Sequence, residues 1–297
     1  MRIGIDLGGT KTELIALDAH REVYRKRVAT PAHDYSLLVE TLGTLVLEAE
    51  RELRTMCSVG IATPGAVSAA TGCIKNSNTQ CMNGRPLHRD LATRLAREIR
   101  IENDANCFAL SEAVDGAGQG ADVVFGAILG TGVGGGVVVH QRVLHGRNAI
   151  GGEWGHNPLP WPNDDERPGF PCYCGKRGCI ETFLSGPGLV QDFGHASGSH
   201  ETAAGIVQRA QLGEGDAVRA LERYYDRLAR GLASVINVLD PDVIVLGGGV
   251  SNVDSLYSEV PPRLAKYVFS DRVDTHLARA QHGDSSGVRG AAWLWPE

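Results

Sequence analysis

The sequence lacks a long apolar run and a leader segment. It has no stretch of about 18 consecutive apolar residues, the length that a membrane-spanning helix needs. Met1 leads directly into "RIGIDLGG", without the basic and apolar regions that make up a signal peptide. We therefore expect a cytoplasmic protein with no membrane partner.

An excess of positive charge is also absent. The 297 residues carry a net charge of −6 at pH 7, so the protein as a whole does not attract nucleic acid or anionic lipid. Its seven cysteines are an odd number, and Cys57, Cys73, Cys81 and Cys107 stand singly. A secreted disulfide framework has an even number of regularly spaced cysteines, so none is expected.

What the sequence does have is a repeated α/β pattern. Strands are predicted at 2–8, 12–18, 22–30, 57–67 and 100–104, and helices at 35–53, 89–99 and 105–118. At 122–146 the opening order of strand, glycine turn and strand returns. A Pro-rich loop at 161–171, a helix at 217–239, a strand with a glycine turn at 241–252 and a helix at 286–295 follow. The repeat indicates two related α/β halves that meet at a cleft.

The glycine-rich turns do not match the standard phosphate-binding fingerprints. "GGTKT" lacks the spacing of a Walker A loop, and "GTGVGGG" does not open a helix as a dinucleotide fingerprint does. Either hairpin alone can be a simple tight turn, but two similar hairpins favour phosphate binding by backbone amides. A third turn, Gly247–Gly249, is suited to pack against an adenine. Asp6 is either a turn cap or the carboxylate that holds a hydrated Mg²⁺.

Acidic and amide side chains in "ENDANC" and "KNSNTQ" are candidates for acceptor chemistry. Asn103 and Asp104 precede a predicted helix, where each can act as a cap. Ligands of α/β sheets also bind at this edge, and phosphoryl transfer to an alcohol needs an aspartate that accepts the hydroxyl proton. Asp104 is the candidate base. Asn78 is either a polar loop residue or a ligand for sugar hydroxyls.

Three cysteines and a histidine predict a metal site. Cys172, Cys174 and Cys179 have the spacing C-x-C-x4-C, and His156 lies sixteen residues upstream of Cys172. Three thiolates and one imidazole make a closed tetrahedral zinc site, so a structural role is expected. A zinc ribbon for nucleic acid would need a basic surface, which the surrounding acidic residues do not provide.

Two glutamates flank the predicted zinc ligands. Glu153 is three residues before His156, and Glu181 is two residues after Cys179. Paired carboxylates accept hydrogen bonds from neighbouring sugar hydroxyls, although both residues can also be solvated. His156 itself can bind zinc through one ring nitrogen and donate the other N–H to a sugar hydroxyl.

Six motifs, in this order, resemble the ROK family of sugar kinases and sugar-responsive repressors: "IGIDLGGTKT", "ENDANC", "GTGVGGG", "GEWGHNPL", "CYCGKRGCIE" and "PDVIVLGGG". The resemblance implies an actin-like ATPase (ribonuclease-H-like) fold of the α/β class, with two lobes around an interlobe cleft. We expect a small lobe at 1–117, with the helix at 286–297 packed on it. We expect a large lobe with the zinc loop at 118–285. The repressors carry an N-terminal helix-turn-helix extension; because the first glycine hairpin already starts at residue 6, we expect none in this protein.

The family resemblance also implies residue roles. Asp104 corresponds to the catalytic base, and Zn²⁺ is bound by His156, Cys172, Cys174 and Cys179. The residues implied to bind the sugar are Asn78, Asn103, Asp104, Glu153, His156 and Glu181. The residues implied to bind ATP with Mg²⁺ are Asp6, Gly8, Gly9, Thr10, Lys11, Thr12, Thr131, Gly132, Gly134, Gly247, Gly248 and Gly249. A homodimer is the usual assembly of the family.

Longer stretches, including "GEWGHNPLPW" and "HGDSSGVRGAAWLWP", are similar to the bacterial fructokinase/mannokinase branch. We therefore predict an ATP-dependent kinase that phosphorylates the 6-hydroxyl of a hexose, with fructose as the preferred acceptor. Mannose, glucose and N-acetylhexosamines are the alternative acceptors, because "NTQCMNG" replaces a segment in which relatives often have tryptophan. A non-catalytic sugar sensor and a zinc-dependent nucleic-acid binder are more distant alternatives.

Overall fold

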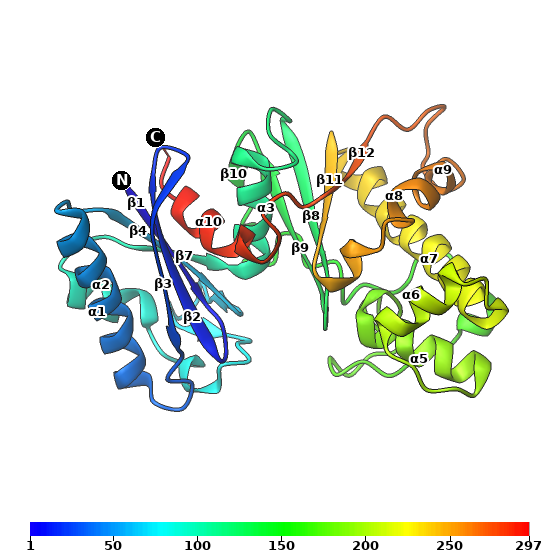
Figure 1. The fold of residues 1–297 in the computed structure, drawn as a ribbon, viewed down its shortest axis with the longest axis horizontal. Coiled ribbons are helices and arrows are strands. Elements are labelled where there is room, and N and C mark those ends of the chain that lie inside the picture. The colour runs from blue at the N-terminus through cyan, green and yellow to red at the C-terminus, as the bar shows by residue number, and fades with distance from the viewer. Residues whose placement is uncertain (297) are drawn as a thin grey trace. The chain divides into compact units, whose positions relative to one another are not determined.

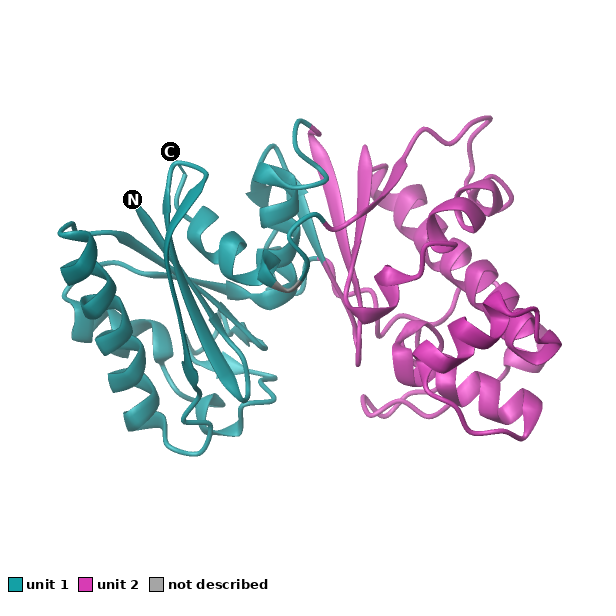
Figure 2. Ribbon diagram, in the orientation of Figure 1, with its two compact units in different colours: residues 1–120, 136–151, 281–297 teal, residues 121–135, 152–280 magenta. Residues whose placement is uncertain are grey.

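The computed structural model describes residues 1–296, and the chain divides into two compact units (Figures 1 and 2). Unit 1 comprises Met1–Gly120, Gly136–Gly151 and Gln281–Glu297, and unit 2 comprises Ala121–Gly135 and Gly152–Ala280. Each unit contains strands of a five-stranded sheet together with helices. The lobe boundaries that the sequence suggested stay a prediction.

Unit 1 begins with a three-stranded antiparallel ribbon that two parallel strands extend. Its sheet has the order β3-β2-β1-β4-β7. Its strands are β1 (Arg2–Leu7), β2 (Lys11–Asp18), β3 (Arg21–Ala29), β4 (Ser58–Thr63) and β7 (Arg100–Asn103), with a small β5–β6 pair (Ala66–Val67, Ile74–Lys75). Its helices are α1 (Tyr35–Leu53), α2 (Leu87–Leu95), α3 (Asp104–Asp115) and α10 (Ser286–Trp293). Ile3, Ile5 and Leu14 share one core with Leu38 and Leu42 of α1.

The helix α10 brings the end of the chain back to the first strands. It packs on β1, β4 and α3, and the sequence provides room for this approach. A β-carbon at Gly60 of β4 would lie 1.8 Å from the carbonyl oxygen of Ala291, so a larger residue does not fit there. In unit 1, helices α1 and α2 contribute to a larger hydrophobic cluster, and α3 and α10 meet in a smaller one.

The second sheet has the order β10-β9-β8-β11-β12, the same pattern as the first. Its strands are β8 (Val123–Leu129), β9 (Val133–Val139), β10 (Arg142–Val143), β11 (Val243–Gly247) and β12 (His276–Arg279). The chain passes from unit 2 into unit 1 within β9. The helices of unit 2 are α4 (Glu181–Leu184), α5 (Gly186–Ser197), α6 (Ala203–Gln211), α7 (Gly215–Leu239), α8 (Leu256–Glu259) and α9 (Pro261–Leu264). Short 3-10 turns lie at Gln80–Met82, Asp164–Glu166, Gly249–Asn252 and Gly283–Ser285.

Several predicted bounds differ from the structure for local reasons. The helix predicted to end at residue 99 ends at Leu95, because Ala96 adopts a left-handed conformation with φ of 51°. The helix predicted from 105 starts at Asp104, with Asn103 as its cap. Strand β12 was not predicted at all. Within the described residues no helix is both long and apolar enough to cross a membrane.

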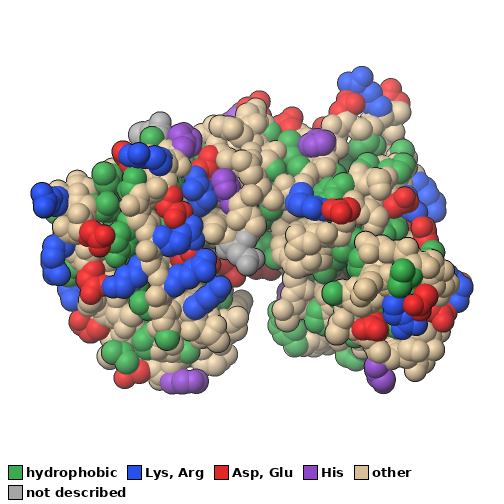
Figure 3. Space-filling view, viewed as in Figure 1, with side chains coloured by type: hydrophobic (Ala, Val, Ile, Leu, Met, Phe, Trp, Pro, Cys, Tyr) green, Lys and Arg blue, Asp and Glu red, His purple; other side chains and the backbone are tan. Residues whose placement is uncertain are grey.

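Basic side chains gather where β2 and β3 of unit 1 lie in this view (Figure 3). Strand β3 is at the edge of its sheet and carries Arg21, Arg25 and Arg27 as exposed residues. Charged side chains on an edge strand discourage pairing with another chain. Arg25 and Arg27 also pair with the carboxylate of Glu13 on β2. The edge position of β3 and the pairing with Glu13 therefore account for this local positive charge.

Candidate functional site

The first glycine turn joins β1 to β2 in unit 1. The Gly8 amide donates to the Lys11 carbonyl at 3.1 Å, and Thr30 Oγ1 donates to the Gly8 carbonyl at 2.8 Å. Thr12 is fully buried, and its Oγ1 lies 2.8 Å from Thr30 Oγ1. Thr12 thus supports the turn from inside, while the exposed residues of the turn are Gly9, Thr10 and Lys11.

Asp6 lies in acidic surroundings one residue before the end of β1. Burial raises the pKa of Asp6 to about 6; the charges of Asp104 and Glu13 add to the rise, and Lys11 opposes it. A β-carbon at Gly287, in the first turn of α10, would be 3.3 Å from Asp6 Oδ2. A carboxylate in this setting is suited to hold a cation or a proton.

The predicted acceptor residues lie at the N-terminus of α3. Asn103 caps the helix: its Oδ1 accepts from the Ala105 amide at 2.9 Å, and its Nδ2 donates to the Gly65 carbonyl at 3.0 Å. Asp104 is exposed, and its Oδ1 also accepts from the Ala105 amide, at 2.9 Å. Asn103 therefore caps the helix, as the simpler interpretation predicted, while Asp104 is the first residue of the helix and is exposed.

Unit 1 brings the predicted sugar-binding loop close to the glycine turn. Thr79 Oγ1 donates to Asn78 Oδ1 at 3.4 Å, and a β-carbon at Gly9 would lie 3.7 Å from the same Thr79 oxygen. Asn78 itself is exposed. The charge of Asp104 also contributes to the raised pKa of Asp6. The Asn78 loop thus lies beside the first glycine turn, and Asp6 is close enough to Asp104 to be affected by its charge.

The second glycine turn joins β8 to β9 in unit 2. The Gly130 amide donates to the Gly132 carbonyl at 3.0 Å, and the Gly130 carbonyl accepts from the Gly186 amide at the start of α5, at 2.8 Å. Gly248 in the third turn has φ of +81°, and a β-carbon there would lie 2.6 Å from the backbone of Leu129. The turn after β11 therefore needs glycine to lie this close to the end of β8.

A cavity of about 650 Å³ opens beside these two turns of unit 2. Its lining includes Gly130, Thr131, Gly186, Val207, Gly249 and Val250. A pocket with apolar walls and backbone amides at one end is typical of small-molecule sites, and its size is sufficient for a nucleoside. The structure thus combines two of the three predicted glycine turns in one cavity.

Two side chains fix the segment around the predicted zinc ligands to the start of β9. Glu181 Oε2 accepts from the Val133 amide at 2.9 Å, and Trp154 Nε1 donates to the Gly134 carbonyl at 2.8 Å. Glu153, which directly precedes Trp154, is exposed. No role was predicted for Trp154 from the sequence. The sequence does place this tryptophan between Glu153 and His156, two predicted sugar ligands, and that position could have indicated a residue that anchors the segment.

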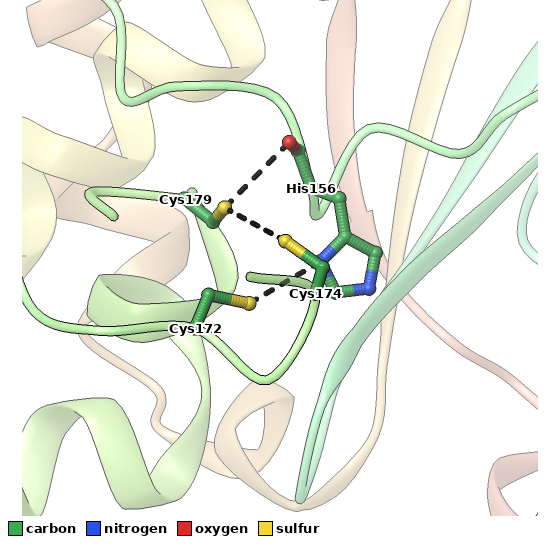
Figure 4. Close-up of side chains that lie close together, drawn as sticks. All are labelled: His156, Cys172, Cys174 and Cys179. Atoms are coloured by element: carbon green, nitrogen blue, oxygen red, sulfur yellow. Dashed lines mark hydrogen bonds between the residues drawn. The ribbon is translucent and has the colours of Figure 1, made fainter. Parts of the chain in front are cut away.

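The four predicted metal ligands converge in unit 2 (Figure 4). Their donor atoms all lie within 4.8 Å of one another. Cys172 Sγ is 3.5 Å from His156 Nδ1, and Cys174 Sγ is 3.6 Å from Cys179 Sγ. Tetrahedral zinc with bonds of about 2.3 Å to sulfur would separate its ligand atoms by about 3.8 Å. The donor set and its spacing therefore fit a zinc ion.

The second ring nitrogen of His156 contacts a tyrosine. His156 Nε2 lies 2.9 Å from the hydroxyl of Tyr173, whose side chain is 85% exposed. The two rings meet edge to face with centroids 5.0 Å apart. From the sequence, the ring nitrogen that does not bind zinc was a candidate donor to a sugar hydroxyl; in the structure Nε2 contacts the Tyr173 hydroxyl.

A buried ion network holds the Pro-rich loop between His156 and the cysteines. Glu166 accepts from Arg227 Nε and Arg230 Nη2, each at 2.7 Å, and Arg227 also donates to Asp192 at 2.7 Å. Burial by itself would raise the pKa of Glu166, but the hydrogen bonds from Arg230 and Arg227 lower it to about 2. This network was not predicted from the sequence, because the partners of Glu166 on α7 lie more than sixty residues away.

Comparisons with known proteins agree across the whole chain. The sequence profile described as "ROK family" matches residues 2–297. The N-acetyl-D-glucosamine kinase of Vibrio cholerae serotype O1 (strain ATCC 39315 / El Tor Inaba N16961) is 43% identical over 299 residues, covering 99% of each chain. The ROK hexokinase of Thermus thermophilus is similar in structure, with a TM-score of 0.87, 33% identity, and 98% and 96% of the two chains covered. A ROK glucokinase of Streptomyces griseus, solved with glucose and AMPPNP, has a TM-score of 0.75, 28% identity, and 99% and 98% covered.

The fold defined by the two matching sheets is that of the actin-like ATPases, as the sequence motifs predicted. Within that class, the similar enzymes named above phosphorylate sugars. The chain belongs to the ROK family and is an ATP-dependent sugar kinase.

Proposed function

We propose that the protein transfers the γ-phosphoryl group of ATP to the 6-hydroxyl of a hexose, with N-acetyl-D-glucosamine as the preferred acceptor. The observation that carries the reaction is the exposed carboxylate of Asp104, next to Asp6 and Asn103 in a ROK sugar kinase. The acceptor rests on the names of relatives that are 41–44% identical, which are N-acetyl-D-glucosamine kinases.

Fructose, the acceptor predicted first from the sequence, stays the second candidate. The relatives' names support a hexose kinase but do not support fructose. What favours fructose is the similarity of "GEWGHNPLPW" and "HGDSSGVRGAAWLWP" to the fructokinase/mannokinase branch.

Asp104 is proposed as the base of the transfer. Its carboxylate accepts the proton of the 6-hydroxyl while that oxygen forms a bond to the γ-phosphorus and the bond to the bridging oxygen of ADP breaks. The Asp104 oxygen that accepts from the Ala105 amide keeps the carboxylate oriented. Asn103 already uses its Oδ1 and one N–H, so its second amide N–H is what it can offer a sugar hydroxyl.

The nucleotide is proposed to use the glycine turns. The cavity beside Gly130 and Gly249 is suited to the nucleoside, and the exposed turn at Gly9 and Thr10 to the phosphates. Asp6 fits a hydrated Mg²⁺, because its partly buried carboxylate lies near other acidic groups. Mg²⁺ bound with the nucleotide supplies charge neutralisation at the phosphates.

Zinc is proposed for the four-residue cluster, in a structural role. His156, Cys172, Cys174 and Cys179 would fill all four positions, so no position is left for a reacting water. The loop that they hold contains Glu153 and Glu181, the proposed ligands of sugar hydroxyls. Glu181 Oε2 is bound to the Val133 amide, so Glu181 would meet a sugar through Oε1. For His156 Nε2 to reach a sugar hydroxyl, the sugar must replace the hydroxyl of Tyr173.

The experiment that tests the function is a panel of sugars in a coupled assay of ADP formation. N-acetyl-D-glucosamine is expected to give the highest kcat/KM, with fructose, mannose and glucose as competitors. A higher value for fructose would overturn the acceptor and leave the kinase intact. No sugar-dependent ADP with any of them would overturn the kinase and favour a sensor.

Metal analysis of the same preparation, expected to give about one zinc per chain, tests the cluster. A metal-free preparation with full activity and stability would refute zinc. The homodimer predicted from the family is tested by light scattering of that preparation.

A further inference from the structure

The loop 144–151 carries a histidine that none of the proposed roles uses. His145 lies two residues after β10, and its Nδ1 is 2.9 Å from Glu102 Oε2. The Glu102 side chain is only 10% exposed, whereas that of His145 is 45% exposed. Glu102 belongs to β7 and directly precedes Asn103 and Asp104, so the contact reaches the proposed acceptor site through one residue.

The other oxygen of Glu102 binds the start of α3. Glu102 Oε1 accepts from the Asn103 amide at 2.8 Å and from Asn106 Nδ2 at 3.0 Å. Asn106 is 6% exposed. An ionised carboxylate only accepts hydrogen bonds, so Nδ1 of His145 must carry the proton that it donates. With donors on both oxygens, the Glu102 carboxylate is held in one orientation and in turn fixes the cap residue Asn103.

The same loop is tied to the segment that leads to Asn78. Lys75 Nζ donates to the carbonyl of Asn148 at 3.2 Å. Lys75 ends β6, three residues before Asn78. The loop also closes on itself, because the Gly151 amide donates to the His145 carbonyl at 3.2 Å. Loop 144–151 therefore contacts both segments of unit 1 in which acceptor residues are proposed.

We infer that His145 is a positioning residue for the phosphoryl acceptor: through Glu102 it sets the orientation of Asn103 and Asp104. This inference rests on the proposed function. A merely structural role is a poor explanation, because an ion pair whose histidine is half exposed contributes only about 0–1 kcal/mol to stability. The value of the contact is geometric, since a small displacement of a base or a substrate ligand has a large effect on turnover.

The test compares His145→Ala with the wild-type protein under steady-state conditions. We expect kcat/KM for the sugar to fall about 10-fold to 100-fold, because the acceptor and its base lose their alignment. The KM for ATP and the Tm are expected to stay unchanged. His145→Asn is expected to restore much of the loss, because its amide N–H can donate to Glu102 as Nδ1 does. In a Glu102→Gln background, the His145 change is expected to add little.

His20→Ala is the matched control. His20 is also a half-exposed histidine of unit 1 beside a carboxylate, with its Nδ1 3.9 Å from Asp115 Oδ2. It should leave kcat/KM for the sugar within about two-fold, as expected for residues that do not share partners. An equal loss in His20→Ala would show a general effect of removing surface imidazoles and would overturn the inference.

Hydrogen exchange of the peptide around 100–107, measured without ligand, gives a readout that does not depend on turnover. His145→Ala should speed exchange of the Asn103 amide several-fold, because Glu102 loses the hydrogen bond to its Oε2. Unchanged exchange together with unchanged kcat/KM would overturn the inference while the kinase stands. If the wild type forms no ADP with any sugar, the proposed function fails and the exchange data alone decide whether His145 positions Asn103. A fall in Tm with equal losses for sugar and ATP would also overturn it.

Discussion

Two carboxylates, the partly buried Asp6 in unit 1 and the buried Glu166 in unit 2, have opposite electrostatic surroundings. Asp6 in unit 1 lies near Asp104 and Glu13, and its pKa is raised to about 6. Glu166 in unit 2 is held by Arg227 and Arg230, and its pKa is lowered to about 2. Both lose water on folding, so the difference comes from their neighbours.

The comparison distinguishes a candidate functional site, around Asp6, from a structural ion network, around Glu166. Around Asp6 the negative charge is only partly balanced, which suits a cation, a proton or a reacting group. Around Glu166 each charge has a partner, which suits a fixed loop. Changes near Asp6 should therefore affect chemistry, and changes near Glu166 should affect folding.

The largest expected effect is that of Asp104→Asn. It removes the proposed base and keeps the size of the side chain, so kcat should fall by about 10²–10⁴ while sugar binding is retained. Steady-state kinetics and calorimetric titration with the sugar measure the two properties. A variant with near wild-type kcat would remove Asp104 from the chemistry.

Arg230→Met tests the supporting side of the comparison. The Arg230 side chain is 2% exposed and that of Glu166 is 3% exposed, so the variant leaves a buried carboxylate short of a partner. The free energy of unfolding should fall by about 3–5 kcal/mol. Arg272→Met, which removes an ion pair with Asp274 at the surface, is the matched control and should cost less than about 1 kcal/mol. Equal losses in both variants would show that the buried network gives no special support.

Asp6→Asn should have two effects of opposite sign. A folded pKa of about 6, raised from 3.8, means that ionising Asp6 lowers stability as pH rises from about 4 to 6. At pH 7.5 the asparagine variant should therefore be more stable than the wild type, by about 1–3 kcal/mol. The same change should raise the KM for Mg·ATP. Denaturant unfolding and kinetics on one preparation test the pair, and a less stable variant would contradict this account of Asp6.

The smallest effect is the pH dependence of stability from Glu166. Its pKa is lowered to about 2 from 4.5, so its contribution is complete above about pH 4.5 and is lost as pH falls toward 2. Unfolding measured between pH 3 and pH 5 should show a smaller slope against pH in Glu166→Gln than in the wild type. Identical slopes would mean that the Arg227 and Arg230 contacts do not favour the ionised form.

Local signals in the sequence predicted much of this molecule. Helix α1 has the predicted bounds 35–53, because its apolar residues keep three-four spacing and Asp34 caps its start. The repeat of strand and glycine turn predicted two related α/β halves, and the structure has two five-stranded sheets with corresponding strand orders. The four zinc-ligand candidates were predicted from spacing, since they lie within 24 residues and converge without help from distant segments.

What the sequence did not reveal depends on contacts between distant segments. Glu166 meets arginines on α7, and Glu102 meets His145 across 43 positions. Neither pairing leaves a local pattern, because the partner of each glutamate lies more than forty residues away in the sequence. The family resemblance implied that Thr12 binds the nucleotide, whereas in the structure its side chain is buried and contacts Thr30.

The most direct test of the central claim is a comparison of N-acetyl-D-glucosamine with its 6-deoxy analogue in an assay of ADP formation. The parent sugar should give ADP and a 6-phosphorylated product. The analogue, which has no hydroxyl beside Asp104 to deprotonate, should bind and give no ADP above the rate without sugar. ADP formation at the same rate with both sugars, or without either, would contradict transfer to the 6-hydroxyl.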